Sequence, residues 1–159
     1  MADIYNPEVL TSTVTFDLVA RSLDEQRDWI IEHSGSYPAI VAVEEGGEGG
    51  DGGDGSGPIV GFASLSPYRP RPAYSTTVES SVYVRRDRQG RGVGRELMER
   101  LMELAVAHGF HAVMARIVGG HEASIALHEK VGFTIVGTEH EVGRKFGRWL
   151  DVVVMQRML

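Results

Sequence analysis

The sequence predicts a single mixed α/β (α+β) domain in which helices flank a central mixed sheet. Three observations support this class. Segments with the alternation of strands and segments with the periodicity of helices follow one another along the whole chain. The stretch 76–108 runs from a strand through a basic, glycine-rich loop into a long amphipathic helix. A length of 159 residues is that of one ordinary domain with one well-buried core, so we treat residues 1–159 as one domain.

The first forty residues are predicted to be mainly helical. Residues 1–9 contain a fragment of an amphipathic helix, and a short extended segment is expected at 14–16. Ser22 is followed closely by an acidic pair, which is the pattern of a helix N-cap, so a helix is expected from there through Ile31. A glycine ends this helix, and a strand is expected at 40–43.

The segment Glu44–Gly57 consists almost entirely of Gly, Glu and Asp. Such a composition cannot bury apolar area, so the segment has little reason to order. Because a strand is expected at 58–65, the segment is predicted to be an overlong, disordered hairpin tip. A calcium loop would need spaced oxygen ligands, and Asp51 and Asp54 among glycines do not have the spacing of an EF-hand.

The segment Ser66–Ser75 contains three prolines, two arginines and two tyrosines. Each proline fixes its φ angle, so the segment is expected to be a stiff loop. It could be a simple surface connection. It could instead form a wall of a ligand pocket, with Arg71 meeting a carboxylate and Tyr74 packing beside it.

The strand and helix of the stretch 76–108 have clear faces. Alternation places Val78, Ser80, Val82 and Val84 on one face of the strand, and Thr77, Glu79, Ser81 and Tyr83 on the other. A carboxylate at position 79 has few structural reasons to stand in a strand made otherwise of Val, Ser and Tyr. The helix is expected to bury Leu97, Met98, Leu101, Met102, Leu104 and Ala105.

The loop Arg85–Gly94, between this strand and this helix, is predicted to cradle a phosphate. Its alternating glycines let the backbone approach an anion, and the first turn of the helix offers unpaired N–H groups at the positive end of its dipole. Formal charge would come from Arg85, Arg86, Arg88, Arg91 and Arg95. The Walker pattern fails because no Lys and Ser/Thr follow the last glycine, and the alternating glycines do not fit G-x-G-x-x-G.

The last third of the chain is predicted to alternate strands with one short helix. The expected elements are a buried strand at 112–118, a turn at Gly119–Gly120, a helix at 121–131 that Gly132 ends, a strand at 133–136, a turn at 143–147 and a last strand at 148–158. Together with the earlier elements they give a three-layer arrangement.

Composition excludes several functions. The chain has no cysteine, so disulfides, thiolate-zinc sites and cysteine nucleophiles are excluded, and its six histidines lack the spacing of metal ligands. The net charge of −6 argues against a nucleic-acid surface, although a local basic patch suits a small polyanion. No apolar run approaches the roughly 20 residues of a membrane helix and no signal peptide is recognisable, so we expect a cytoplasmic protein without a membrane partner.

The segment Gln89-Gly90-Arg91-Gly92-Val93-Gly94 resembles the Q/R-x-x-G-x-G/A signature of the GNAT superfamily of N-acetyltransferases. The order of elements over 78–108 and 112–118, and the segment Lys130–Phe133, are also similar to the GNAT core. The resemblance implies a GNAT-like sheet and acetyl-CoA as cosubstrate. It implies a cofactor-binding set made of Val82, Tyr83, Val84, Gln89, Gly90, Arg91, Gly92, Val93, Gly94, Arg95, His121 and Ser124.

Further segments resemble the phosphinothricin N-acetyltransferase branch of this superfamily. They are Ile4–Asn6, Thr15-Phe16, Arg71–Tyr74, Val78–Val84, Ser124 through Glu129, and Lys145–Asp151. That branch acetylates the amino group of small amino-acid analogues such as phosphinothricin and methionine sulfoximine or sulfone, so the resemblance implies a small-molecule amine substrate. It also implies a homodimer.

The chain departs from this pattern in three places. A first strand is expected ahead of Ile4 in the family and is apparently missing here, which would leave a bare sheet edge. The acidic glycine-rich tip is additional. His121 stands where the superfamily usually has an asparagine that hydrogen-bonds the pantetheine arm, and histidine can also donate or accept there.

The resemblance implies Glu79 as the general base that takes the proton of the amine, directly or through water. His128 occupies the position of a tyrosine that protonates the departing sulfur in many GNAT enzymes, and it could act as that acid, assist the base or simply pack. A backbone N–H near Val82–Val84 would meet the oxyanion. No metal is needed.

Two other functions stay open at this point. One is acetylation of a protein amino terminus or of a polyamine, although the two arginines of the loop, Arg69 and Arg71, favour a substrate carboxylate over a polyamine. The other is a non-catalytic acyl-CoA-binding sensor, against which the glutamate at position 79 argues.

Overall fold

The computed structural model describes residues 1–44 and 57–159. Its helices are α1 (Ala2–Thr11), α2 (Leu23–Glu32), α3 (Val93–Ala107) and α4 (Glu122–Lys130), with 3-10 turns at Pro72–Tyr74 and Arg86–Arg88. Its strands are β1 (Ala39–Val43), β2 (Ile59–Pro67), β3 (Thr77–Val84), β4 (Ala112–Val118), β5 (Thr134–Lys145) and β6 (Arg148–Met158). The predicted tip at 44–57 lies outside the described residues except for its two ends.

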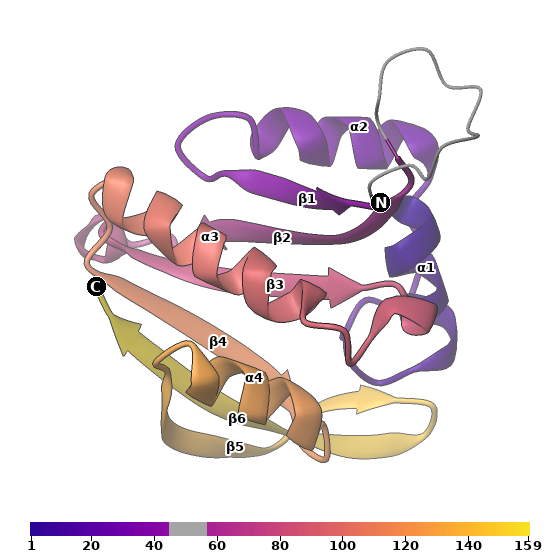
Figure 1. Ribbon diagram of the computed structural model, residues 1–159. Coiled ribbons are helices and arrows are strands. Elements are labelled where there is room, and N and C mark those ends of the chain that lie inside the picture. Colours follow the sequence, from indigo (N-terminus) through magenta and orange to yellow (C-terminus); the bar gives the residue numbers. More distant parts are fainter. Residues whose placement is uncertain (45–56) are drawn as a thin grey trace.

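The six strands form one mixed sheet in the order β1-β2-β3-β4-β6-β5 (Figure 1). Neighbouring strands are antiparallel except β3 and β4, which are parallel. Helices α1 and α2 lie on one face, where Tyr5 contacts Tyr83 and Trp29 contacts Phe62. Helices α3 and α4 lie on the other. The predicted class, a mixed sheet flanked by helices, is confirmed, and β1 forms one edge of the sheet.

Helix α2 begins where the sequence predicts because its first turn is capped twice. The hydroxyl of Ser22 accepts the N–H of Glu25 at 3.3 Å, and the Glu25 carboxylate accepts the N–H of Ser22 at 2.8 Å. This reciprocal capping box satisfies two N–H groups that a helix start otherwise leaves unpaired.

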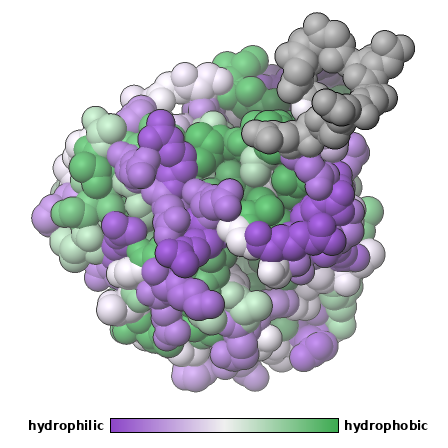
Figure 2. Space-filling view, in the orientation of Figure 1, coloured by the Kyte–Doolittle hydropathy of each residue, from purple (hydrophilic) through white to green (hydrophobic). Residues whose placement is uncertain are grey.

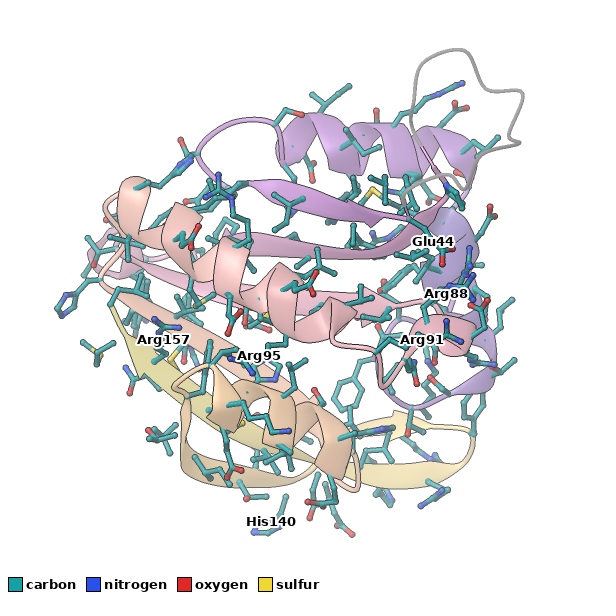
Figure 3. All side chains as sticks on the ribbon, viewed as in Figure 1. Glu44, Arg88, Arg91, Arg95, His140 and Arg157 are labelled. Atoms are coloured by element: carbon teal, nitrogen blue, oxygen red, sulfur yellow. The ribbon has the colours of Figure 1, made fainter. Side chains whose placement is uncertain are left out.

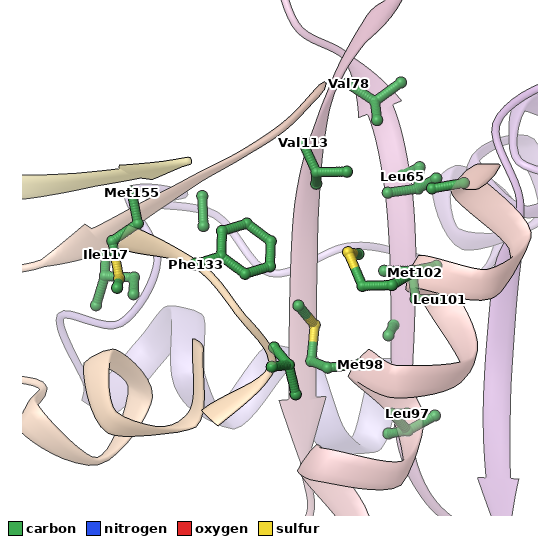
Figure 4. Close-up of a cluster of buried hydrophobic side chains, with 14 residues drawn as sticks. Leu65, Val78, Leu97, Met98, Leu101, Met102, Val113, Ile117, Phe133 and Met155 are labelled. Atoms are coloured by element: carbon green, nitrogen blue, oxygen red, sulfur yellow. The ribbon is translucent and has the colours of Figure 1, made fainter. Parts of the chain in front are cut away.

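The main core lies between α3 and the sheet (Figure 4). Helix α3 buries Leu97, Met98, Leu101, Met102 and Ala105 against Leu65, Val78 and Val113. The helix can approach closely because position 61 in β2 is a glycine. A Cβ atom there would come within 2.9 Å of Leu97 Cδ1 and 3.1 Å of the Tyr83 carbonyl.

Two predicted boundaries are wrong at the hairpin of β5 and β6, the end of the first strand and the start of the turn. The strand expected at 133–136 continues to Lys145 as β5. The expected turn at 143–147 shrinks to Phe146 and Gly147, both of which have positive φ, as tight two-residue hairpin turns require. Position 143 belongs to β5 and pairs with Leu150. It is a glycine because a Cβ atom there would lie 2.4 Å from the ring of Phe16.

The segment between α1 and α2 was expected to be extended at 14–16 and instead is bent, and it pairs with none of the strands that the structure describes. Side chains hold it in place. The Tyr5 hydroxyl donates to Asp17 at 2.5 Å and lies 3.1 Å from the Thr15 hydroxyl. The buried Lys145 at the end of β5 donates from Nζ to the Thr15 carbonyl at 2.8 Å.

We expect Leu101→Ala to lower the free energy of unfolding by about 2 to 5 kcal/mol, because the side chain is fully buried and its removal leaves a cavity. Val106→Ala, an exposed position on the same helix, should change it by no more than about 0.5 kcal/mol. Urea unfolding of both variants measures the difference. Equal effects would contradict the packing of α3 described above.

Candidate active site

The site is built where β3 and β4 stop pairing. Their ladder consists of three residue pairs and ends at Glu79 and Met114, and beyond it the Ser80 hydroxyl reaches the Met114 carbonyl at 3.3 Å. The strands then diverge toward the glycine loop (Figure 1). Within the described part of the chain, the edge of β3 from 81 to 84 has no ladder partner in β4. Apart from the Val84 carbonyl, which accepts from the Gln89 side-chain amide, the backbone groups along this edge can therefore pair with an extended ligand.

The glycine loop joins this open edge to the start of α3. Gly90 and Gly92 have φ angles of 73° and 91°, and Gly92 is the N-cap of the helix. The first amides bonded within the helix are those of Arg95 and Glu96, both to the Gly92 carbonyl, so the amides of residues 93 and 94 precede the bonded ladder. Backbone of this kind at a helix start is suited to an anion.

Most arginines of the loop are already engaged. Ion pairs join Arg85 to Asp87, Arg86 to Glu8, Arg88 to Glu44 and Asp87, and Arg95 to Glu99. Among residues 1–44 and 57–159, Arg91 is the loop arginine without an ion-pair partner. Figure 3 shows Arg88 beside Glu44 and Arg91 beyond them. The prediction that five arginines contribute positive charge around the loop stays a prediction, and Arg91 is the one of the five that has no ion-pair partner among the described residues. Figure 2 shows how the hydrophilic and hydrophobic residues are distributed over this side of the molecule.

Glu79 lies on the face of the sheet opposite the main core. It pairs in register with Ser66 of β2 and Met114 of β4, whereas its neighbour Val78 is fully buried in the core on the other face. Burial raises the pKa of the half-buried Glu79 carboxyl, and the positive charges of Arg116 and Arg69 act against that rise. A carboxylate with a raised pKa is a stronger base than an exposed one.

His128 is buried on α4, with its ring edge against Phe133 at a centroid distance of 5.1 Å. Its Nδ1 lies 2.8 Å from the Ser124 carbonyl. Because a carbonyl can only accept, Nδ1 carries the proton and Nε2 of the neutral ring is an acceptor. Burial also lowers the pKa of this imidazole. The geometry favours a proton acceptor or a hydrogen-bond acceptor over an acid.

The other predicted site residues are placed as follows. His121 is the N-cap of α4 through its backbone, and its Nε2 lies 3.1 Å from the Thr13 hydroxyl. The Gln89 amide donates to the Val84 carbonyl at 3.2 Å, which ties the loop to the end of β3. Tyr74 packs edge-on against Tyr68, and Arg71 precedes the 3-10 turn on the surface.

Sequence reasoning missed two charged side chains near Glu79. Arg116 of β4 stands on the same face, and both of its terminal nitrogens donate to Glu139 of β5. The signal was available, since Arg116 is a single charge within the otherwise apolar strand 112–118. In the described ranges, no group of three or more His, Asp or Glu side chains could hold a metal ion. Nor is any described helix both long and apolar enough to cross a bilayer.

Comparison with known proteins identifies the class. The chain matches the family described as "Acetyltransferase (GNAT) family" over residues 5–133. It therefore belongs to the GNAT family and is an N-acetyltransferase.

Its relatives include a phosphinothricin N-acetyltransferase of Streptomyces coelicolor, 40% identical over 161 residues, covering 100% of this chain and 89% of the relative. An L-methionine sulfoximine/L-methionine sulfone acetyltransferase of Pseudomonas aeruginosa is 39% identical, covering 96% and 84%.

A solved structure of a phosphinothricin acetyltransferase from Sinorhizobium meliloti in complex with AcCoA is similar, with a TM-score of 0.88, 35% identity, and coverage of 99% of this chain and 80% of that one. A ribosomal-protein-alanine N-acetyltransferase from Brucella melitensis has a TM-score of 0.90 and 36% identity, covering 99% and 91%.

We expect nitrogen-resolved NMR to find His128 neutral at pH 7, with its proton on Nδ1. Its titration should occur below the ordinary histidine value of about 6.5, because burial disfavours the charged ring. The variant His128→Gln assigns the resonance. A proton on Nε2, or titration above the ordinary value, would contradict the assigned tautomer.

Proposed function

We propose that this N-acetyltransferase transfers the acetyl group of acetyl-CoA directly to the amino group of a small amino acid or analogue of the phosphinothricin, methionine sulfoximine or methionine sulfone type. One observation carries the proposal. A half-buried carboxylate, Glu79, stands at the point where β3 parts from β4, on the same strand that leads into the glycine loop. The names of the relatives support this substrate class.

The residues present fit acetyl-CoA as the cosubstrate. Its pantetheine amides suit the open edge at Val82, Tyr83 and Val84, and its pyrophosphate suits the loop backbone with Arg91. The remaining members of the proposed set are Gln89, Gly90, Gly92, Val93, Gly94, Arg95, His121 and Ser124. Acetyl-CoA supplies the activated acetyl group as a thioester, and a solved relative in complex with AcCoA supports this assignment.

Glu79 is proposed as the general base. The amine of a substrate has a pKa near 10, comparable with that of lysine, so most of it is protonated at neutral pH. The Glu79 carboxylate removes this proton, directly or through water. The neutral amine then attacks the thioester carbonyl, and a backbone N–H near Val82–Val84 stabilises the oxyanion. The C–S bond breaks as the amide forms, and coenzyme A leaves as a thiol when its sulfur takes the second proton that the nitrogen loses. His128 presents an acceptor at Nε2 and is proposed to assist the base.

Arg71 and Tyr74 are proposed to line the substrate side, with a cation for the substrate carboxylate. Arg69 on the same loop lies over the Tyr68 ring at 5.0 Å and acts electrostatically on Glu79. Two arginines beside the site favour a zwitterionic amino acid and disfavour a polyamine.

We also propose a cytoplasmic homodimer. The hairpin of β5 and β6 exposes Val142, Phe146 and Trp149, each at least half exposed at 50%, 56% and 60%. Large apolar side chains gathered on one hairpin are suited to association with a second copy.

A protein amino terminus is the second candidate, because a structurally similar protein is named ribosomal-protein-alanine N-acetyltransferase. A thiol-release assay with DTNB separates the two. Release with free amino acids, sulfoximines or sulfones supports the proposed function. Release with amino-terminal peptides alone supports the second candidate. Binding of acetyl-CoA without thiol release from any amine would indicate a non-catalytic sensor.

We expect Glu79→Gln to lower kcat at neutral pH by at least about tenfold, and by up to about 10⁴-fold, because the base is removed. The dissociation constant for coenzyme A should stay nearly unchanged. Single-turnover kinetics and calorimetry measure the two quantities. An unchanged rate would remove Glu79 from the base role.

We expect Gly92→Val to raise KM for acetyl-CoA several-fold, because a β-branched residue is strained at a φ of 91° and would move the loop backbone. Gly109→Val is the matched control. It imposes a similar strain at a φ of 78°, at the far end of α3. The control should lose stability with little change in KM, and equal KM values for both variants would argue against the phosphate cradle.

A further inference from the structure

The sheet carries a second pair of charges close to the proposed base. In β4, Val113, Ala115 and Ile117 belong to the core beneath α3 and α4, so the alternate positions Met114 and Arg116 face the other side. Glu79 is level with Met114 across the parallel ladder and shares that side. The guanidinium group of Arg116 therefore stands on the same face as the Glu79 carboxylate, one side-chain position further along β4.

Arg116 is held from the far side by Glu139. Its Nη1 donates to Glu139 Oε1 at 3.2 Å, and its Nη2 donates to Oε2. Glu139 of β5 pairs with Val152 of β6, and Arg116 of β4 pairs with Val154. The ion pair thus crosses β6 on the face of the sheet that carries Glu79. A two-pronged contact of this kind fixes the plane of a guanidinium group.

The charged groups around Glu79 come from several elements. Arg116 of β4 and Arg69 of the loop after β2 favour the carboxylate form, whereas Glu139 of β5 disfavours it. On the β2 side, Ser66 lies opposite Glu79 and its hydroxyl contacts His33 Nε2 at 3.1 Å. Of the three charged side chains, Arg116 has the largest effect on the pKa of Glu79, and Glu139 has the second largest.

We propose that the Arg116–Glu139 ion pair is a positioning element that sets the charge state in which Glu79 meets the substrate amine. Arg116 favours the ionised form of the half-buried Glu79 carboxyl. Glu139 holds Arg116 in place and partly neutralises its charge. Glu79 is therefore not tied to Arg116 in a permanent ion pair and can still accept a proton from the amine. The proposal rests on the proposed role of Glu79.

The two partners have opposite charges, so single substitutions should act in opposite directions. In Arg116→Gln, Glu79 faces the unpaired Glu139, and the acid limb of the kcat/KM profile should move to higher pH. In Glu139→Gln, Arg116 is released from neutralisation, and the limb should move to lower pH. The double variant should fall between them. The ionisation of the substrate is common to all profiles, so differences among them report on the enzyme.

At the acid end of the profile, we expect kcat/KM of Arg116→Gln to fall at least about threefold below wild type when each profile is normalised to its alkaline value. Arg116→Lys should restore most of the loss. Arg144→Gln is the matched control, because it removes one positive charge from β5 on the opposite face, where Arg144 lies over Trp149. The control profile should coincide with that of wild type.

Carbon NMR of labelled glutamate, assigned with Glu79→Gln, reads the protonation of Glu79 without turnover. Titration midpoints that rise in Arg116→Gln and fall in Glu139→Gln support the proposal. Midpoints that do not move, or that move in the same direction, overturn it. If Glu79→Gln keeps full activity while the midpoints move as expected, the base assignment fails and the electrostatic link stands, so the two failures are distinguishable.

Discussion

The parting of β3 from β4 is the constraint on which the rest of the site depends. Parallel strands in a sheet normally satisfy each other's backbone groups, and here they do so over three residue pairs only. After β4 has turned away, β3 stays in the sheet through its antiparallel ladder with β2, which runs from Val78 to Val84, and α3 packs closely against the opposite face at Gly61 of β2. An open strand edge, a glycine loop and a helix start are thereby lined up along one continuous stretch of chain.

Most of the arginines around this edge form ion pairs within the protein. Four of the five loop arginines are tied to carboxylates of the protein, mostly at the surface, where such pairs add little stability. Their effect is to fix the shape of the loop and to leave Arg91 as its available cation within the described residues. On the other side of β4, Arg116 is held in a comparable way by Glu139. At both places, carboxylates of the protein pair with arginines that lie near the site.

The elements whose signals are local could be predicted from the sequence. The N-cap at Ser22, the glycine loop and the apolar face of α3 each depend on residues a few positions apart, and the structure has them where they were expected. The turn at 143–147 was misplaced because Gly143 was interpreted as a turn residue, whereas a side chain from 127 positions earlier, Phe16, excludes a Cβ atom there. The Arg116–Glu139 pair was out of reach for the same reason. It depends on the register of three strands, which no short stretch of sequence specifies.

The buried Lys145 has a consequence for an enzyme whose chemistry modifies amines. The chain contains two lysines among sixteen basic residues, and arginine is not a nucleophile because its guanidinium stays protonated. The amine of Lys145 is buried and donates a hydrogen bond to the Thr15 carbonyl. Of the two lysines, Lys130 is the exposed one. The protein therefore offers very few targets for its own acetylation, and its folded form is largely sheltered from self-modification.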